Sequence, residues 1–232
     1  KTPYGEPSCP YEIEKIDDIE VLFLRRHGQK HSIPPHKVNY RANIYGFKHF
    51  GVERIFGVFA TGSLNETITP GSIVIPDQII DFTQGIRANT FYEGENVVHI
   101  DFTEPFCSET RHHLLETARK FGINVIPHGT YICVNGPRLE TSAEIKFFKN
   151  IGADIIGMTI MPEASLAREV ELCYAAVAVV ANYAAGISKS PLTVKEVIET
   201  MKNSIDKVSF LIKETIKKLP KERNCLCQHA LK

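Results

Sequence analysis

The chain has 232 residues, and its 27 Lys and Arg balance 27 Asp and Glu, so the formal net charge is zero. This balance excludes a general nucleic-acid binder, which needs a positive field to attract phosphates, and a polybasic membrane-surface protein. Hydrophobic residues make up 43% of the chain, which is typical of a globular domain. No apolar run is long enough to span a bilayer and no secretion signal opens the sequence, so we expect a cytoplasmic protein without a membrane partner.

Strand-like and helix-like patterns alternate along the chain. They predict a single-domain α/β fold with a mixed, mostly parallel central sheet flanked by helices. The predicted strands are 21–24, 54–59, 72–80, 130–134, 154–158 and 173–181. The predicted helices are 36–50, 108–121, 141–150, 162–172 and 193–218. Ligands bind beyond the carboxyl ends of strands in such sheets, so the loops after the strands should carry the functional residues.

Three of these loops are candidates for binding an anion. Arg26 and His27 follow the first predicted strand and could grip an oxyanion, although a surface basic cluster is the simpler interpretation of this loop alone. Backbone amides around Ala60 could face an anion, or form an ordinary turn. Thr159 precedes a predicted helix N-terminus, where free N–H groups and the helix dipole favour anions.

Two further loops carry polar side chains that could recognise a ligand. Glu140 follows the strand 130–134 and is either a ligand or an ordinary first-turn acid. Asn182 ends the longest apolar strand, although Asn is also common in turns. Together with the anion-binding candidates, these residues describe one site with a polar recognition pair.

The six cysteines do not form a dense disulfide scaffold. Cys133 and Cys173 lie in apolar runs and are expected to be buried small hydrophobes. Cys225, Cys227 and His229 offer three metal ligands, but the one-residue gap is tighter than usual zinc spacing and a fourth ligand is missing. We therefore expect no metal site and favour an oxidised Cys225–Cys227 pair, as occurs in intracellular proteins of hyperthermophiles.

The loops resemble those of the methylthioadenosine and methylthioinosine phosphorylases, a group within the trimeric purine nucleoside phosphorylase family. The resemblance runs in order along nearly the whole chain. It is carried by Arg26-His27-Gly28, by the run 31–44 (HSIPPHKVNYRANI), and by Gly62-Ser63-Leu64, Glu104-Pro105-Phe106-Cys107, Gly136-Pro137-Arg138, Gly157-Met158-Thr159, Pro162-Glu163 and Cys173-Tyr174.

The resemblance implies the nucleoside phosphorylase fold and reversible phosphorolysis, with inorganic phosphate as co-substrate and no other cofactor. By family position, phosphate would be held by Arg26, His27, the Ala60 backbone and Thr159, while Met158 would lie along the ribose. Phosphate attacks the anomeric carbon through an oxocarbenium-like state, which a dianion fixed beneath the sugar stabilises.

The identity of the purine base is predicted from a difference between this chain and the adenine-specific members of the family. Adenine-specific members carry Asp-Tyr-Asp where this chain has Asn182, Tyr183 and Ala184. An Asn amide can donate to O6 and N7 of a 6-oxopurine, and Glu140 can accept from its N1–H. We therefore predict a 6-oxopurine leaving base, with Asn182 and Glu140 as the catalytic pair and Asn182 stabilising negative charge near N7. An adenine-type methylthioadenosine phosphorylase is the alternative.

The 5′ end of the nucleoside is predicted from Val194, which stands where inosine phosphorylases place a His. An apolar wall favours a methylthio group over a hydroxyl, so we predict S-methyl-5′-thioinosine, with inosine and guanosine as secondary candidates. His99 corresponds to a family residue that reaches into a neighbouring subunit's site. The resemblance thus implies a homotrimer or homohexamer.

Two departures leave other functions open. The match begins at Thr2–Gly5, after the strand and Gly-rich phosphate loop that open the family, so we expect this chain to lack that loop. Phe59 stands where relatives often carry Thr, Ser or Asn beside the phosphate. A catalytically weak homologue with an assembly or ligand-binding role therefore stays open, as does hydrolysis with water replacing phosphate.

Overall fold

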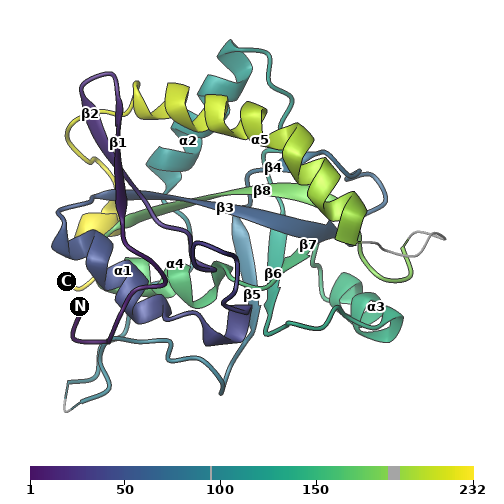
Figure 1. The fold of residues 1–232 in the computed structure, drawn as a ribbon, viewed down its shortest axis with the longest axis horizontal. Coiled ribbons are helices and arrows are strands. Elements are labelled where there is room, and N and C mark those ends of the chain that lie inside the picture. Colours follow the sequence, from purple (N-terminus) through teal and green to yellow (C-terminus); the bar gives the residue numbers. More distant parts are fainter. Residues whose placement is uncertain (95, 188–193) are drawn as a thin grey trace.

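The computed structural model describes residues 1–94, 96–187 and 194–232 (Figure 1). Its strands are β1 (Glu12–Ile16), β2 (Ile19–Phe23), β3 (Arg54–Ser63), β4 (Ile73–Val74), β5 (Gln78–Phe82), β6 (Thr130–Val134), β7 (Ile155–Gly157) and β8 (Cys173–Tyr183). Its helices are η1 (Pro35–Lys37), α1 (Tyr40–His49), α2 (Ser108–Lys120), α3 (Ser142–Asn150), α4 (Ile160–Glu169), α5 (Val194–Ile216) and η2 (Leu226–His229). Within those ranges, every helix is too short or too polar to cross a bilayer.

Six strands form the central sheet in the order β4-β8-β3-β7-β6-β5. The pairs β3–β8, β6–β7 and β5–β6 are parallel, while β4–β8 and β3–β7 are antiparallel. The predicted single-domain α/β fold with a mixed, mostly parallel sheet is thus confirmed.

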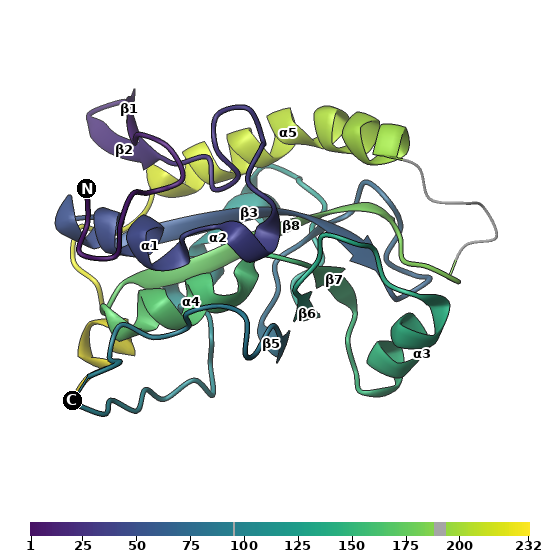
Figure 2. The same cartoon turned by 60° about the horizontal axis from the view of Figure 1, so that its bottom comes forward.

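Strand β8 is the centre of the core because helices cover both of its faces. Its side chains are buried from Cys173 to Ala181, and a strand buried on both faces reads as one continuous apolar run. Successive side chains point to opposite faces, so Ala176, Ala178 and Val180 join the core with α1 and α4 while Val177 and Val179 join the core with α2 and α5. Figure 2 shows α5 and α4 on opposite sides of the β3–β8 layer.

The predicted strand 21–24 is present as β2, but its expected place in the central sheet is wrong. It pairs with β1 in a separate two-stranded antiparallel hairpin, in the register Glu12 with Phe23. Three of its five residues are exposed and none is buried, whereas a central strand of such a sheet is buried on both faces. Arg26 and His27 therefore do not follow a strand of the central sheet.

The predicted strand 72–80 is two strands that lie at opposite edges of the sheet. Ile73–Val74 pairs antiparallel with β8, and Gln78–Phe82 pairs parallel with β6. Pro76 lies between them and has no N–H with which to continue a ladder. The chain consequently stops pairing with β8 after Val74 and begins to pair with β6 at Gln78.

Helix α3 begins as its sequence predicts. The Thr141 side chain accepts a hydrogen bond from the backbone of Glu144, and the Glu144 side chain accepts one from the backbone of Thr141. This capping box satisfies two N–H groups that a helix start leaves unpaired. It fixes the end of the loop that carries Glu140.

Candidate active site

The sheet changes direction at Gly62, and several predicted site residues surround this point. Gly62 pairs with Asn182 of parallel β8 on one side and with Ile156 of antiparallel β7 on the other. A Cβ at Gly62 would lie 3.3 Å from Asn182 Nδ2 and 3.2 Å from an Ile156 methyl carbon, so glycine leaves room for the amide. Ala60 lies two residues earlier and is exposed. We call this region the strand junction.

Asn182 keeps hydrogen-bonding capacity at the strand junction. Its Nδ2 donates to the Tyr183 carbonyl at 2.8 Å, which fixes the amide and leaves a second N–H and the Oδ1 acceptor. Ala184 is buried in the core cluster that contains Ile156. Its backbone lies close to Gly62, where a Cβ would be 3.7 Å from the Ala184 Cα.

Met158 packs against the loop between β6 and α3. A Cβ on Gly136 would lie 2.4 Å from the Met158 sulfur, and Gly136 has a φ of +62°. Only glycine fits there without strain. The loop that carries Glu140 is thereby joined to the loop that carries Met158 and Thr159.

Thr159 is buried and is the residue before α4, as the sequence predicts, but the first turn of this helix is irregular. The Thr159 side chain makes no capping hydrogen bond, and Met161 and Pro162 have non-helical backbone angles. A proline disfavours helical geometry in the residue before it, and Met161 accordingly has a ψ of 134°. The regular part of the helix therefore begins after Pro162, a few residues beyond Thr159.

Arg26 is held by Glu163, a residue that our sequence reasoning did not assign to the site. Arg26 Nε donates to Glu163 Oε1 at 2.7 Å and Nη2 donates to Oε2 at 3.0 Å, while Nη1 donates to the Val58 carbonyl at 2.9 Å. A guanidinium has five N–H donors, so two remain for another acceptor. A carboxylate in the first turn of a buried helix was the available sequence signal for Glu163.

The surroundings of Arg26 keep it charged. Burial alone disfavours the charged form, but the Glu163 carboxylate raises the pKa of Arg26 above its ordinary value. Tyr174 donates from its hydroxyl to Glu163 Oε2 at 2.7 Å. The Arg26 guanidinium carbon lies 4.6 Å from the centre of the buried Phe59 ring. Phe59 therefore contacts the cation through its ring face.

His27 is oriented by a backbone contact. Its Nδ1 lies 2.8 Å from the Ile33 carbonyl oxygen, which can only accept, so Nδ1 carries a hydrogen. Burial lowers the pKa of His27, with the Arg26 charge acting in the same direction. A neutral ring then presents an acceptor at Nε2, and a protonated ring presents a donor.

The structure describes Glu140 and His99 by position and burial alone. In the described ranges no hydrogen bond joins Glu140 to Asn182; burial, opposed in part by its own backbone N–H, raises the pKa of the half-buried Glu140 carboxyl. His99 is exposed in the long connection between β5 and α2. The side chain of Val194 lies outside the described residues.

A cavity of about 510 Å³ opens beside Arg26 and Glu163. Residues of β2, α1, β3 and α5 also line it, and most of them are apolar. Asn182, Thr159 and Glu140 are not among the lining residues. This cavity therefore lies beside the anchored arginine and is distinct from the strand junction.

Comparison with known proteins gives the family. The phosphorylase superfamily model matches residues 1–217. The "Probable S-methyl-5'-thioinosine phosphorylase" of Thermodesulfovibrio yellowstonii is 89% identical over 232 residues, covering 100% of this chain and 88% of that protein. The 6-oxopurine nucleoside phosphorylase of Pyrococcus furiosus is 52% identical over 239 residues, covering 100% of this chain and 89% of that protein.

Solved structures of similar proteins point to the same family as the sequence relatives. The methylthioadenosine phosphorylase of Schistosoma mansoni in complex with adenine has a TM-score of 0.92 and 36% identity, covering 96% of this chain and 84% of that one. The chain therefore has the nucleoside phosphorylase fold. The chain belongs to the phosphorylase superfamily.

Proposed function

We propose that the protein catalyses phosphorolysis of a 6-oxopurine nucleoside, S-methyl-5′-thioinosine foremost. Phosphate oxygen bonds to the anomeric carbon as the bond to purine N9 breaks, which gives hypoxanthine and 5-methylthioribose 1-phosphate. The observation that carries the proposal is the Asn182 amide at the strand junction. Asn182 pairs with Gly62, which lies two residues after Ala60 on β3. An amide there matches the keto edge of the base.

On the phosphate side, the proposal assigns binding to Arg26, His27, the Ala60 backbone and Thr159. Two N–H groups of Arg26 are uncommitted once its bonds to Glu163 and Val58 are counted. The ion pair with Glu163 fixes the direction of these donors before phosphate arrives, which lowers the cost of ordering them on binding. Phosphate held in this way stabilises the positive charge that develops on the sugar.

On the base side, Asn182 donates to O6 or N7 and the Glu140 carboxylate accepts from N1–H. As the glycosidic bond breaks, negative charge develops on the purine, and the Asn182 N–H stabilises it. Adenine presents a lone pair at N1, so a carboxylate facing it would be unpaired and repelled. Unpaired buried polar groups discriminate strongly between substrates, which favours this function over an adenine-type enzyme.

For the sugar, we propose that Met158 lies along the ribose, with Ala184 close to the base and Val194 against the 5′ substituent. The close packing of Met158 on Gly136, which fixes the Met158 side chain, supports the proposed place of Met158 along the ribose. His99 would complete the site of a neighbouring subunit in a homotrimer or homohexamer, which suits its exposed position. The Val194 assignment predicts a higher kcat/KM for S-methyl-5′-thioinosine than for inosine; a preference for inosine would refute it.

The experiment that tests the reaction type follows hypoxanthine release with and without inorganic phosphate. Phosphorolysis predicts release that depends on phosphate concentration and yields a sugar 1-phosphate in equal amount. Release at the same rate without phosphate would instead indicate hydrolysis. Binding of hypoxanthine with neither phosphate binding nor turnover would indicate a ligand-binding homologue, and would refute the proposal.

A further inference from the structure

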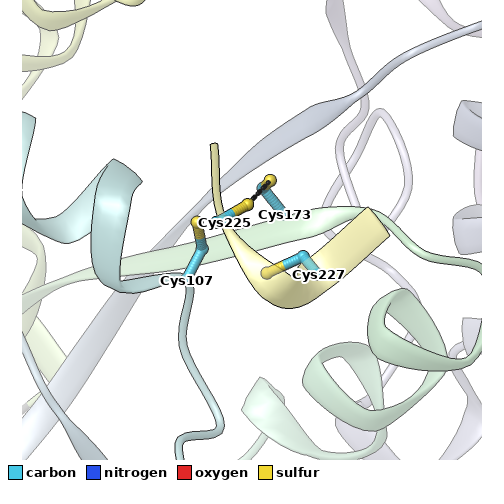
Figure 3. A group of neighbouring side chains, drawn as sticks. All are labelled: Cys107, Cys173, Cys225 and Cys227. Atoms are coloured by element: carbon cyan, nitrogen blue, oxygen red, sulfur yellow. Dashed lines mark hydrogen bonds between the residues drawn. The ribbon is translucent and has the colours of Figure 1, made fainter. Parts of the chain in front are cut away.

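Four cysteines form a buried cluster (Figure 3). Their four sulfur atoms all lie within 4.8 Å of one another, and all four side chains are buried. Cysteine is the only residue type in this cluster. We call it the cysteine cluster; its members are Cys107, Cys173, Cys225 and Cys227.

The fold assembles the cysteine cluster from three separate segments. Cys107 is the N-cap of α2, Cys173 is the first residue of β8, and Cys225 and Cys227 lie at the start of η2. The sequence expectation that a fourth ligand is missing is therefore wrong, because tertiary structure supplies Cys107 and Cys173. His229 is exposed and stays outside the cluster.

Backbone hydrogen bonds fix the segments that carry these sulfurs. The Cys107 N–H donates to the Tyr174 carbonyl at 2.8 Å, and the Cys173 N–H donates to the Glu53 carbonyl at 2.9 Å. The Asn224 N–H, just before Cys225, donates to Glu109 on α2 at 3.1 Å. The positions of the four sulfur atoms are thus set by the fold. The one-residue gap between Cys225 and Cys227 is therefore a weaker argument against a zinc site than it is in the sequence alone.

The environment of Cys107 favours a thiolate. Its sulfur accepts hydrogen bonds from the Thr110 N–H at 3.4 Å and the Thr110 hydroxyl at 3.3 Å. It also lies at the N-terminus of α2, where the helix dipole favours negative charge.

The sulfur positions suit a tetrahedral ion. With Zn–S bonds of about 2.3 Å, sulfurs at the corners of a tetrahedron lie roughly 3.8 Å apart. The Cys173 and Cys225 sulfurs lie 3.3 Å apart, and the other pairs fall within 4.8 Å. Shifts of under about an ångström convert this arrangement into a four-thiolate site.

We propose that Cys107, Cys173, Cys225 and Cys227 bind one Zn²⁺ in a closed, structural site. Four soft thiolates in tetrahedral geometry select zinc over the hard cations Mg²⁺ and Ca²⁺. Binding converts four thiols to thiolates and releases their protons to solvent. With four protein ligands no coordination position is open to substrate, so the ion ties the C-terminal segment to α2 and β8 and takes no part in phosphorolysis.

The geometry favours this site over the oxidised Cys225–Cys227 pair expected from the sequence. All six cysteines are free thiols in the structure. The hydrogen-bonding partner of the Cys225 sulfur is Cys173. Oxidation of any pair would remove two of the four ligands, so disulfide formation and zinc binding exclude each other here.

The test measures metal content on the whole chain purified under reducing conditions without chelators. Elemental analysis is expected to find about one Zn²⁺ per chain. Replacement of the zinc by Co²⁺ is expected to give the visible absorption of a tetrahedral four-thiolate centre. The double variant Cys225→Ser/Cys227→Ser should lose the metal and melt at a lower temperature, with phosphorolysis retained below its melting point. Cys9→Ser, outside the cluster, is the matched control and should keep the metal.

Three results would overturn the proposal. One is reduced wild-type protein that takes up neither Zn²⁺ nor Co²⁺ when these are offered. Another is a mass and thiol titration showing disulfides among the four cysteines in freshly purified protein. The third is equal zinc content in wild type and the double variant, which would place the ion elsewhere. The first two measurements need no variant, so they decide the question even where the double variant does not fold.

Discussion

Glu163 holds the Arg26 guanidinium through two parallel hydrogen bonds, Nε to Oε1 at 2.7 Å and Nη2 to Oε2 at 3.0 Å. The Arg26 side chain is 20% exposed and that of Glu163 is 7% exposed, so water screens the pair poorly. Tyr174 donates to the same carboxylate. Glu163 therefore fixes the direction of the two Arg26 N–H groups that remain uncommitted, and we predict that it acts as a positioning residue for phosphate.

Replacing Glu163 tests this arrangement. Glu163→Gln removes the charge that balances Arg26 and should cost about 3–5 kcal/mol of the free energy of unfolding. It should also raise the KM for phosphate about tenfold, equivalent to roughly 1.4 kcal/mol. Steady-state kinetics at a temperature where the variant is folded measure the second effect.

Glu169→Gln is the matched control for Glu163→Gln. Glu169 is a buried acid of the same helix, but its carboxylate accepts from the Phe91 N–H and does not contact Arg26. This control should lower stability without changing the KM for phosphate. Equal phosphate KM values in wild type and Glu163→Gln would contradict the positioning role.

Gly136 is predicted to be essential for the placement of Met158. Gly136→Ala puts a methyl group 2.4 Å from the present Met158 sulfur position and strains a backbone with φ of +62°. Met158 must then move, so the KM for the nucleoside should rise about tenfold or more. Gly152→Ala is the control, because Gly152 has a φ of +92° with nothing within 4 Å of its Cβ. It should cost about 1 kcal/mol of stability with unchanged kinetics.

His27 is predicted to make anion binding stronger at lower pH. Burial lowers the pKa of His27 below 6.5, and as the pH falls through this lowered pKa, Nε2 gains a hydrogen that it can donate to an oxyanion. Sulfate is the better probe for calorimetry, because it stays a dianion across this range while phosphate titrates. Its affinity should rise as the pH falls in wild type and stay flat in His27→Asn.

In the absence of an anion, the lowered pKa of His27 makes the folded protein less stable as the pH falls. Since the folded-state pKa of His27 is lowered, the unfolded chain binds this proton more readily, and the contribution of His27 to stability is lost as the pH falls below about 6.5. Sulfate affinity that weakens at low pH in wild type would contradict the proposed role.

Glu140 is predicted to set the acid limb of kcat/KM for the nucleoside. It must be ionised to accept from N1–H, and burial raises its pKa above the ordinary value. Activity should therefore be lost as the pH falls through this raised pKa. Glu140→Gln should lower kcat/KM about tenfold at neutral pH and abolish that limb.

Glu144→Gln is the control for Glu140→Gln. Hydrogen bonds from Arg138 lower the pKa of Glu144 to about 2, so its titration lies outside the range of the acid limb. The control should keep its capping box, because a glutamine side chain at this position can also accept from the Thr141 N–H, and it should keep the wild-type pH profile. An unchanged acid limb in Glu140→Gln would remove Glu140 from base recognition.

The elements with clear local signals were predictable from the sequence. Strand β6 and helix α3 lie where the pattern places them, because apolar runs and caps such as Thr141 act through neighbouring residues. The division between β4 and β5 was missed although Pro76 marks it, because the apolar run continues on both sides. Strand β2 was placed in the wrong sheet, since local pattern does not specify the pairing partner.

The parts of the site that depend on tertiary contacts were not predictable in the same way. Glu163 is far from Arg26 in the sequence, and nothing in the local pattern of either residue pairs them. The cysteine cluster likewise needs α2, β8 and the C-terminal segment to meet. The strand junction at Gly62 arises from an antiparallel β3–β7 pair, a reversal that alternating strands and helices do not predict.

The central claim is that Asn182 selects a 6-oxopurine. The most direct measurement compares kcat/KM for S-methyl-5′-thioinosine and S-methyl-5′-thioadenosine in wild type and in Asn182→Asp, at the same phosphate concentration. We predict that wild type prefers the inosine compound by at least about 100-fold and that the substitution shifts the ratio towards the adenosine compound. Equal use of both compounds by wild type, or a ratio that Asn182→Asp leaves unchanged, would contradict the claim.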